Sequence, residues 1–166
     1  MKTFIKIIKL ILNAVTSLII IVGAIFILLF AIGIQPYVVE SGSMQPTIAT
    51  GSVCFVNKRA SYDDMQVGDI IAFRLESDSF ATHRIYEITE DGFITKGDAN
   101  ANIDAVITTR DTFIGKNVFS IPKVGFAVKT IQTTRGRIII GTIVIILFLA
   151  GILIGEPSKK MKKIKS

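Results

Sequence analysis

The chain of 166 residues contains one cysteine and one histidine, and this scarcity limits the chemistry it can carry. A single cysteine, Cys54, excludes an intramolecular disulfide and a cysteine-rich metal site. Because Cys54 lies in the apolar run Val53-Cys54-Phe55-Val56, we expect a buried structural thiol. Zinc would need more ligands than this cysteine and His83 supply. We therefore predict no metal site and no organic cofactor.

Acidic residues are also scarce, since 13 Asp and Glu stand against 19 Lys and Arg and give a net charge of +6. A basic chain can indicate a nucleic-acid partner. Here the excess lies beside two apolar blocks: Lys2, Lys6 and Lys9 precede the first, and five lysines follow the second. The stretch between the blocks, 36–134, is net acidic. The charge therefore indicates membrane topology, and we expect no nucleic-acid partner.

Two long runs lack any charged residue, 10–34 near the start of the chain and 138–154 near its end. A helix needs about 20 apolar residues to cross the hydrocarbon core of a bilayer. We predict transmembrane helices over 10–34 and 138–155. Two alternatives stay open. The first run could be a cleavable signal peptide with a site at 31–33, and the second could be a buried core helix.

Positive charge outside both runs predicts the orientation of the chain. By the positive-inside rule, the N-terminal segment 1–9 and the basic tail 156–166 are cytoplasmic. The domain 35–137 is then extracytoplasmic, in a multi-pass protein of the plasma membrane. Arg135 and Arg137 lie on the outer side of the second run and argue against this orientation, but the lysine-rich tail outnumbers them.

The middle of the chain alternates short β-like runs with turn signals. We predict a mostly β protein, with a small antiparallel β domain flanked by an N-terminal and a C-terminal transmembrane helix. Glu90-Asp91-Gly92 predicts a hairpin, and no helical period stands out between the two apolar runs. The expected strands are 37–40, 52–57, 69–74, 82–89, 92–96 and 112–121.

Three groups of polar residues could carry acyl-transfer chemistry, which needs a nucleophile, a base and an oxyanion site. They are the serine-containing segment 41–47, the single histidine His83, and the acidic segment 96–104. Each has an ordinary explanation on its own: a turn, a structural histidine and a solvated loop. A histidine is distinctive because imidazole titrates near neutrality.

Taken in chain order, these segments resemble the motifs of signal peptidase I, from the first apolar run through residue 122. The match is closest to the histidine-using branch of archaea, the endoplasmic reticulum and some Gram-positive bacteria, since His83 stands where other members carry a lysine base. Ala99 replaces an asparagine of the family pattern. The four motifs are Ser41-Gly42-Ser43-Met44-Gln45-Pro46-Thr47, Gly68-Asp69-Ile70-Ile71-Ala72-Phe73, Thr82-His83-Arg84-Ile85, and Lys96-Gly97-Asp98-Ala99-Asn100 followed by Asp104.

The resemblance implies a membrane-bound serine endopeptidase that removes N-terminal signal peptides from exported preproteins, after small residues at positions −1 and −3. Its partners would be secretory preproteins and the lipid bilayer, with the translocation machinery as a further candidate. Two alternatives stay open: a catalytically silent protein that binds signal peptides or belongs to a translocation complex, and a protease dedicated to a few clients such as surface-fibre proteins.

The resemblance also assigns roles to residues. Ser43 is the expected nucleophile and His83 the general base. Asp104 is favoured over Asp98 as the acid that orients His83, because the family places that acid at the later position, and Asp98 would stiffen the loop or assist. The Ser43 backbone N–H and the Ser41 hydroxyl are the expected oxyanion donors.

Chain geometry gives one further expectation about the membrane. Ser43 follows the end of the first apolar run at Ile34 closely enough to lie within roughly 30 Å of it, even in a fully extended chain. The nucleophile is then held near the outer membrane surface. We also expect Val38, Met44 and Ile48 to form a shallow apolar surface toward the lipid.

Overall fold

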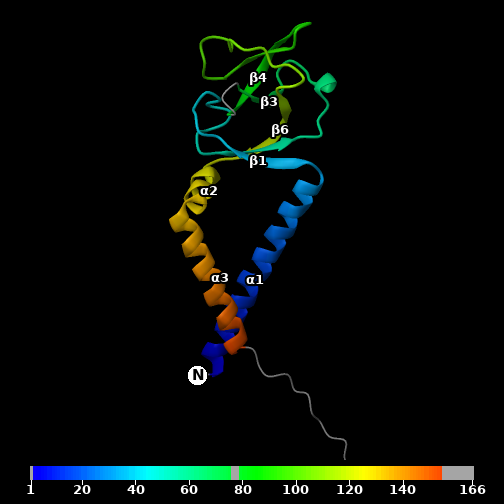
Figure 1. The fold of residues 1–166 in the computed structure, drawn as a ribbon. Helices are drawn as coiled ribbons and strands as arrows, with labels where there is room; N and C mark the ends of the chain where they lie inside the picture. The colour runs from blue at the N-terminus through cyan, green and yellow to red at the C-terminus, as the bar shows by residue number, and fades with distance from the viewer. Residues whose placement is uncertain (1, 76–78, 155–166) are drawn as a thin grey trace, which may run out of the picture. The chain divides into compact units, whose positions relative to one another are not determined.

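The computed structural model describes residues 2–75 and 79–154 and divides into two compact units (Figure 1). One unit is Ile25–Gln132, which contains all the motifs named above. The other contains helix α1 (Lys2–Ala31) up to Ala24, together with helix α3 (Thr134–Ile154).

The unit Ile25–Gln132 is built on one six-stranded antiparallel sheet, so the predicted antiparallel β domain is confirmed. The strands lie in the order β1-β2-β6-β3-β4-β5. A 3₁₀ helix, η1, lies between β2 and β3, and a short α-helix, α2, follows the last strand, β6. Their bounds are β1 Ile34–Val38, β2 Val53–Asn57, η1 Tyr62–Asp64, β3 Ile70–Arg74, β4 Phe80–Ile88, β5 Phe93–Lys96, β6 Phe113–Ile121 and α2 Val124–Gln132.

Each of the six expected strands corresponds to one of these, with the largest difference at β1. The strand predicted at 37–40 is Ile34–Val38 in the structure. Ile34, the last residue of the predicted helix 10–34, therefore belongs to the strand, where it pairs with Asn57 of β2. The helix ends at Ala31, and Gly33 (φ +89°) turns the chain into the strand. An apolar run contains no signal for the point at which a helix becomes a strand, so the boundary was misplaced.

The hairpin predicted at 90–92 is confirmed between β4 and β5. Thr89 N donates to Gly92 O over 2.9 Å, and Gly92 adopts φ +140°, which favours glycine. Helix α2 was not predicted. Its sequence contains glycine and several β-branched residues, all of low helix propensity. Tertiary packing supports it, since Gly125 N donates to Gly51 O and the Phe126 ring covers Gly51.

The sheet has buried side chains on both faces. In β3, Ala72 packs into a cluster with Met44, Ile48, Cys54 and Val56. The alternate residues Ile71 and Phe73 pack into a second cluster with Met65, Ile85 and Phe93. The first cluster packs the segment after β1 against the sheet, and the second contains Ile85 from the centre of β4. They are the hydrophobic core of the unit.

The expected apolar surface toward the lipid is wrong for two of its three residues. Met44 is 1% exposed and Ile48 is 2% exposed, and both belong to the core. Because they lie on a short irregular segment, they anchor that segment to the sheet. Cys54 is fully buried, as predicted, and burial raises the pKa of its thiol to about 11.

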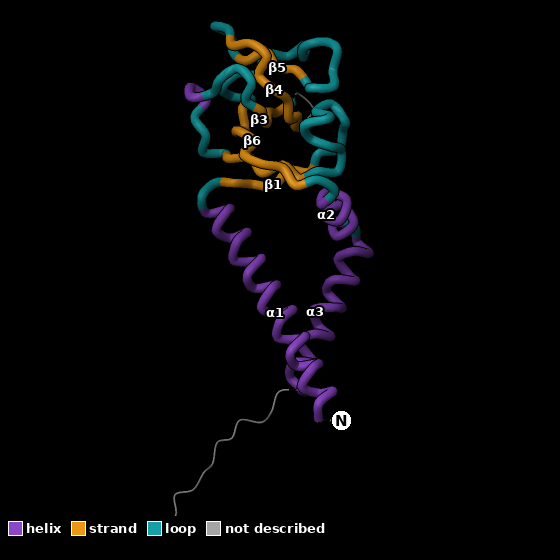
Figure 2. Tube along the Cα trace, turned by 180° about the vertical axis from the view of Figure 1, so that it is seen from behind, coloured by secondary structure: helices purple, strands orange, loops and turns teal. Residues whose placement is uncertain are grey.

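The sheet is strongly curved, as Figure 2 shows. Strands β2, β6 and β3 lie between β1 and β4 in the sheet order, yet Tyr37 of β1 meets Phe80 of β4 edge to face at 4.7 Å. The curvature therefore brings the segment that follows β1 close to the first half of β4. This is where the site described below is formed.

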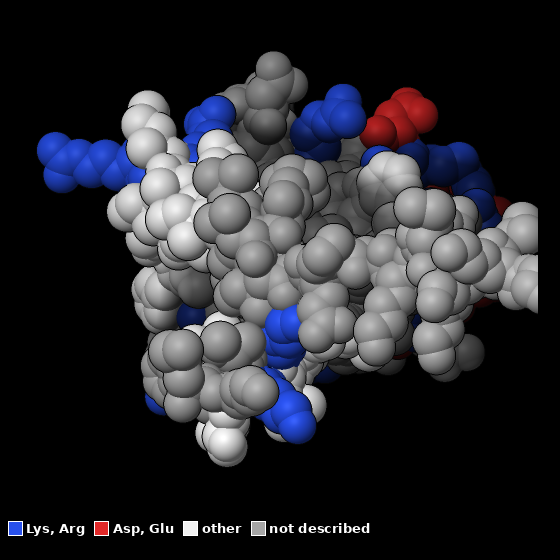
Figure 3. Space-filling view, turned by 90° about the horizontal axis from the view of Figure 1, so that it is seen from below, with Lys and Arg blue, Asp and Glu red and all other residues white. Residues whose placement is uncertain are grey.

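Among the described residues, one helical stretch is long and apolar enough to cross a bilayer: Lys6–Ala31, whose best window has a mean hydropathy of 2.9 and is 0% buried. The helix meets this criterion by its length and composition alone. Helix α3 covers the second apolar run as far as Ile154, and residues 155–166, with the basic tail, lie outside the described residues. On the face seen in Figure 3, basic side chains are more numerous than acidic ones.

Candidate active site

Ser43 lies on the irregular segment between β1 and β2 and is held from two sides. The next residue, Met44, is buried in the core and accepts a backbone hydrogen bond from Ile48 N over 2.8 Å. The Ser43 carbonyl accepts a hydrogen bond from Ala99 N over 2.8 Å. Gly97 lies against the same carbonyl, where a Cβ would be 2.7 Å from the oxygen. The serine backbone is therefore fixed, while the residue remains partly exposed.

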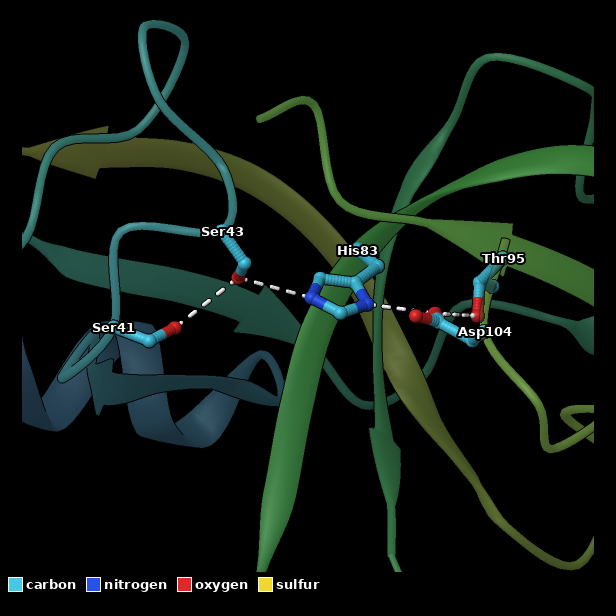
Figure 4. Close-up of polar contacts among 5 residues, drawn as sticks. All are labelled: Ser41, Ser43, His83, Thr95 and Asp104. Atoms are coloured by element: carbon cyan, nitrogen blue, oxygen red, sulfur yellow. Dashed lines mark hydrogen bonds and ion pairs between the residues drawn. The ribbon is translucent and has the colours of Figure 1, made fainter. Parts of the chain in front are cut away.

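His83 comes from the first half of β4, opposite Ile71 of β3. Its ring lies against Phe73, with 6.0 Å between the ring centres. Its Nε2 atom is 2.9 Å from Ser43 Oγ, and a dashed line marks this contact in Figure 4. The serine and the histidine, 40 residues apart in the chain, thus lie in direct hydrogen-bond contact.

Asp104 lies on the other side of the imidazole. Its Oδ2 atom is 2.6 Å from His83 Nδ1, and the two side chains are 18% and 13% exposed. An ionised carboxylate can only accept hydrogen bonds, so this contact needs the proton on Nδ1. Nε2 of a neutral ring is then the acceptor for the Ser43 hydroxyl. Ser43, His83 and Asp104 form one hydrogen-bonded chain, which we call the Ser43–His83–Asp104 chain.

Asp98 is not in contact with the His83 ring but pairs with Arg84. Arg84 Nε donates to Oδ1 over 2.9 Å and Nη2 to Oδ2 over 2.7 Å, while Nη1 donates to Gly68 O over 2.8 Å. The Arg84 hydrogen bond holds the pKa of the Asp98 carboxyl below its usual range, with a smaller contribution from Thr47, against the opposing effect of burial. Of the two candidate acids, Asp104 is therefore the one placed at the imidazole.

The solvated-loop alternative for segment 96–104 does not fit its two acids, although residues 101–103 are exposed. Asp98 and Asp104 are each less than one-fifth exposed, and both carboxylates are bound to other side chains. Because Arg84 directly follows His83 in β4, the Arg84–Asp98 pair ties the strand of the histidine to the loop that holds the Ser43 carbonyl.

Ser41 lies on the opposite side of Ser43 from the imidazole (Figure 4), and its Oγ is 3.1 Å from Ser43 Oγ. The hydroxyl is exposed, so it can turn toward a bound group. The Ser43 backbone N–H donates to no acceptor within the described part of the chain. Two donors are therefore available beside the serine oxygen.

A groove of about 780 Å³ runs past these side chains. One wall is β1 with the residues that follow it, and the other is the end of β3 with the first half of β4. Ser43 and His83 both face into it. The described residues that line it are Pro36, Tyr37, Val38, Val39, Glu40, Ser41, Ser43, Leu75, Ser79, Phe80, Ala81, Thr82, His83 and Gln132.

Among residues 2–75 and 79–154, no three His, Cys, Asp or Glu side chains gather closely enough to hold a metal ion. The groups that meet at the groove are a hydroxyl, an imidazole and a carboxylate, joined by hydrogen bonds.

Comparison with known proteins decides the family. The family model described as "Signal peptidase, peptidase S26" matches residues 10–105, more than half of the chain. The chain belongs to the signal peptidase family. The resemblance inferred from the four motifs is thereby confirmed, including the histidine-using branch. The matched region ends before β6 and α2, which complete the sheet and one end of the groove.

Two relatives in the signal peptidase family show the extent of the likeness. "Signal peptidase I W" of Bacillus subtilis (strain 168) is 42% identical over 71 residues, which cover 40% of this chain and 37% of that protein. "Putative signal peptidase complex catalytic subunit SEC11B" of Homo sapiens is 35% identical over 83 residues, which cover 46% of this chain and 49% of that protein. The chain thus matches less than half the length of either relative.

The contacts of two side chains at this site were not predicted from the sequence. Arg84 is the partner of Asp98, and its place directly after the histidine was the available signal. Thr95 donates a hydrogen bond from Oγ1 to Asp104 Oδ2 over 2.6 Å. No sequence signal pointed to Thr95, because the contact depends on the chain returning alongside β5.

Proposed function

We propose that the protein is a membrane-bound serine endopeptidase that removes N-terminal signal peptides from exported preproteins. Membership of the signal peptidase family supports the substrate class. The observation that carries the proposal is the Ser43–His83–Asp104 chain on the wall of an open groove. Each link has hydrogen-bond geometry without any movement of the protein.

The proposed reaction begins with proton transfer inside this chain. As Ser43 Oγ attacks the scissile carbonyl carbon, His83 Nε2 takes the hydroxyl proton and becomes imidazolium. Asp104, bound at Nδ1, stabilises that positive charge. The imidazolium then protonates the leaving amine as the C–N bond breaks, which leaves the signal peptide joined to Ser43 as an ester. Water, deprotonated by the same imidazole, hydrolyses the ester and restores the serine.

The negative charge that develops on the carbonyl oxygen needs hydrogen-bond donors. We assign this role to the Ser43 backbone N–H and the Ser41 hydroxyl. The N–H is not used by the described residues, and the hydroxyl lies 3.1 Å from the attacking oxygen on the side away from His83. Removing one such donor typically reduces turnover ~10²–10³-fold.

The groove suits an extended substrate. In β4, residues Phe80–His83 pair with β3 and with no other strand of the described part of the chain, because pairing with β5 begins at Arg84. One edge of the strand is therefore open beside His83. β1 lies at an edge of the sheet and forms the opposite wall. A peptide that adds to such an edge gains backbone hydrogen bonds that do not depend on its sequence, and the small residues at −1 and −3 are the preference that the family implies.

We further propose that the protein is anchored in the plasma membrane by α1 and α3, with both termini cytoplasmic and the sheet domain outside. α1 contains the apolar stretch Lys6–Ala31, and its side chains are not buried by protein. In α3, the residues whose burial is described, up to Ile146, are exposed apart from Gly136, which does not favour a buried core helix. α1 passes into β1, which forms a wall of the groove, so removal of the helix as a leader is not favoured.

The end of α1 belongs to the same compact unit as Ser43 and is held there by contacts with the segment 53–59. Arg59 Nη2 donates to Ala31 O over 2.7 Å, and Phe26 contacts Phe55 of β2. This attachment supports a nucleophile that acts near the membrane surface, where the cleavage site of a signal peptide leaves its own apolar segment.

The experiment uses the purified full chain in detergent with a preprotein that carries an Ala-x-Ala cleavage site. The proposal expects a mature product that begins at the residue after this site. A preprotein that binds but stays intact would favour the silent signal-peptide-binding alternative. Cleavage of surface-fibre precursors, with other preproteins left intact, would indicate a dedicated protease.

A further inference from the structure

Thr95 occupies a position that none of the four motifs includes. It lies in β5, opposite Ile85 of β4, and is fully buried. Its hydroxyl donates to Asp104 Oδ2 over 2.6 Å, and its carbonyl accepts a hydrogen bond from Asp104 N over 2.8 Å. Thr95 therefore binds Asp104 at the side chain, as Figure 4 shows, and also at the main chain.

The carboxylate oxygen that Thr95 contacts is the one that faces the imidazole. Asp104 Oδ2 lies 2.6 Å from His83 Nδ1 and 2.6 Å from Thr95 Oγ1. Two short contacts on one oxygen fix the rotation of the carboxylate about its Cβ–Cγ bond, whereas one contact would leave it free to turn about that hydrogen bond. Because the threonine is on a paired strand and has no access to water, it has little freedom to move away.

We propose that Thr95 is a positioning residue whose hydroxyl holds the Asp104 carboxylate against His83 and so keeps the imidazole proton on Nδ1. The inference rests on the proposed function, since a proton on Nδ1 leaves Nε2 free to accept the Ser43 proton. Without the hydroxyl, Asp104 Oδ2 loses a donor in a buried setting, and the carboxylate gains freedom to rotate away from the ring.

The chain contains a matched control for this test. Thr108 is also fully buried, and its hydroxyl has no hydrogen-bond partner among the described residues. Thr95→Val and Thr108→Val make the same chemical change, a hydroxyl replaced by a methyl group of similar size, in two equally buried places. Only the first removes a contact with Asp104.

The first readout needs no activity. Because His83 is the only histidine, ¹⁵N-histidine labelling of the full chain in detergent gives NMR signals from a single ring. At a pH where the ring is neutral, the wild type, Thr95→Ser and Thr108→Val should show a protonated Nδ1 and an unprotonated Nε2. Thr95→Val should move both ¹⁵N shifts toward the average of the two tautomers. Wild-type shifts in Thr95→Val would overturn the inference.

The second readout is cleavage of an Ala-x-Ala peptide. Loss of a hydrogen bond to a charged group predicts a fall in kcat on the order of tenfold for Thr95→Val, with KM little changed. Thr95→Ser should restore most of the rate, and Thr108→Val should keep it. An equal fall in Thr95→Ser and Thr95→Val would overturn the role of the hydroxyl. If Thr95→Val does not fold, Thr95→Ser and Thr95→Ala, which differ by the hydroxyl alone, give the same comparison.

The two readouts separate this inference from the proposed function. A wild type that shows the Nδ1 tautomer but no peptidase activity would contradict the function, and the tautomer comparison would still decide the role of Thr95. An active wild type with unchanged shifts and rates in Thr95→Val would contradict the role of Thr95 alone.

Discussion

The Asp98 carboxylate forms a two-point ion pair with Arg84, the residue next to His83, and does not contact the imidazole itself. The residue that follows Asp98, Ala99, donates its backbone N–H to the Ser43 carbonyl. The pair therefore links the strand that carries the proposed base to the segment that carries the proposed nucleophile. Asp98 acts on the positions of both residues, whereas Asp104 acts on the imidazole directly.

This difference predicts distinct results for the two acids. Asp104→Asn should lower kcat ~10²–10⁴-fold, because an amide does not select the Nδ1 tautomer, and should change the unfolding temperature little. Asp98→Asn should lower the unfolding temperature and reduce activity less. Peptide cleavage rates and thermal unfolding in the same detergent measure both effects. The assignment would be wrong if Asp98→Asn were the more inactive variant with unchanged stability.

The Arg84–Asp98 pair predicts a pH dependence of stability. Because Arg84 lowers the pKa of Asp98 in the folded state, the stabilisation is present above the unfolded pKa, about 4, and is lost as pH falls through the folded value. The difference in unfolding temperature between wild type and Asp98→Asn should therefore be larger at pH 7 than near pH 3.

Asp63 provides the control for that experiment. It pairs with Arg110 in a similar two-point contact, but both side chains are more than 60% exposed. Exposed ion pairs contribute little to stability, so Asp63→Asn should scarcely change the unfolding temperature at either pH. If the difference in unfolding temperature between wild type and Asp98→Asn stayed constant from pH 7 to pH 3, the proposed stabilisation by the Arg84–Asp98 pair would be wrong.

Ser41 gives a prediction about the oxyanion site. Ser41→Ala should lower kcat ~10²–10³-fold with little change in KM, because the missing donor acts on the transition state. Ser41→Thr keeps a hydroxyl and should retain more of the rate. Steady-state kinetics on an Ala-x-Ala peptide measure the effect. A Ser41→Ala variant as fast as wild type would leave the Ser43 N–H as the donor and remove Ser41 from the site.

We expect the thiol of Cys54 to be unreactive in the folded protein. It is fully buried, and burial raises its pKa to about 11, so the reactive thiolate is scarce at neutral pH. A maleimide reagent at pH 7 should leave the folded protein unlabelled and should label one thiol per chain after denaturation. Rapid labelling of the native protein would show that the core around β2 opens readily.

The sequence predicted the β domain well because its local signals agree with the tertiary structure. The alternation in β3 matches two buried faces, and Gly92 permits the turn between β4 and β5. Failures came where long-range packing decides. Met44 and Ile48 look like exposed apolar residues in a turn, but they are buried in a cluster with residues of β2 and β3. Helix α2 has low intrinsic propensity and depends on Gly51 and its neighbours.

The same distinction holds in the site. Ser43, His83 and Asp104 lie in family motifs, and in the structure their side chains form one hydrogen-bonded chain. Thr95 has no motif, since its contact with Asp104 arises only when the segment after β5 folds back and Phe93 pairs with Thr108. A polar residue on a buried strand cannot be linked to a distant acid from spacing alone.

The most direct test of the central claim is the initial rate of preprotein cleavage by wild type, Ser43→Ala and His83→Ala, at equal concentrations of folded protein. The account predicts a mature product from the wild type and rates lower by ~10³-fold or more for each variant. Because the two residues act as one unit, the double variant should be no slower than the slower single variant. Cleavage by Ser43→Ala at the wild-type rate would contradict the account.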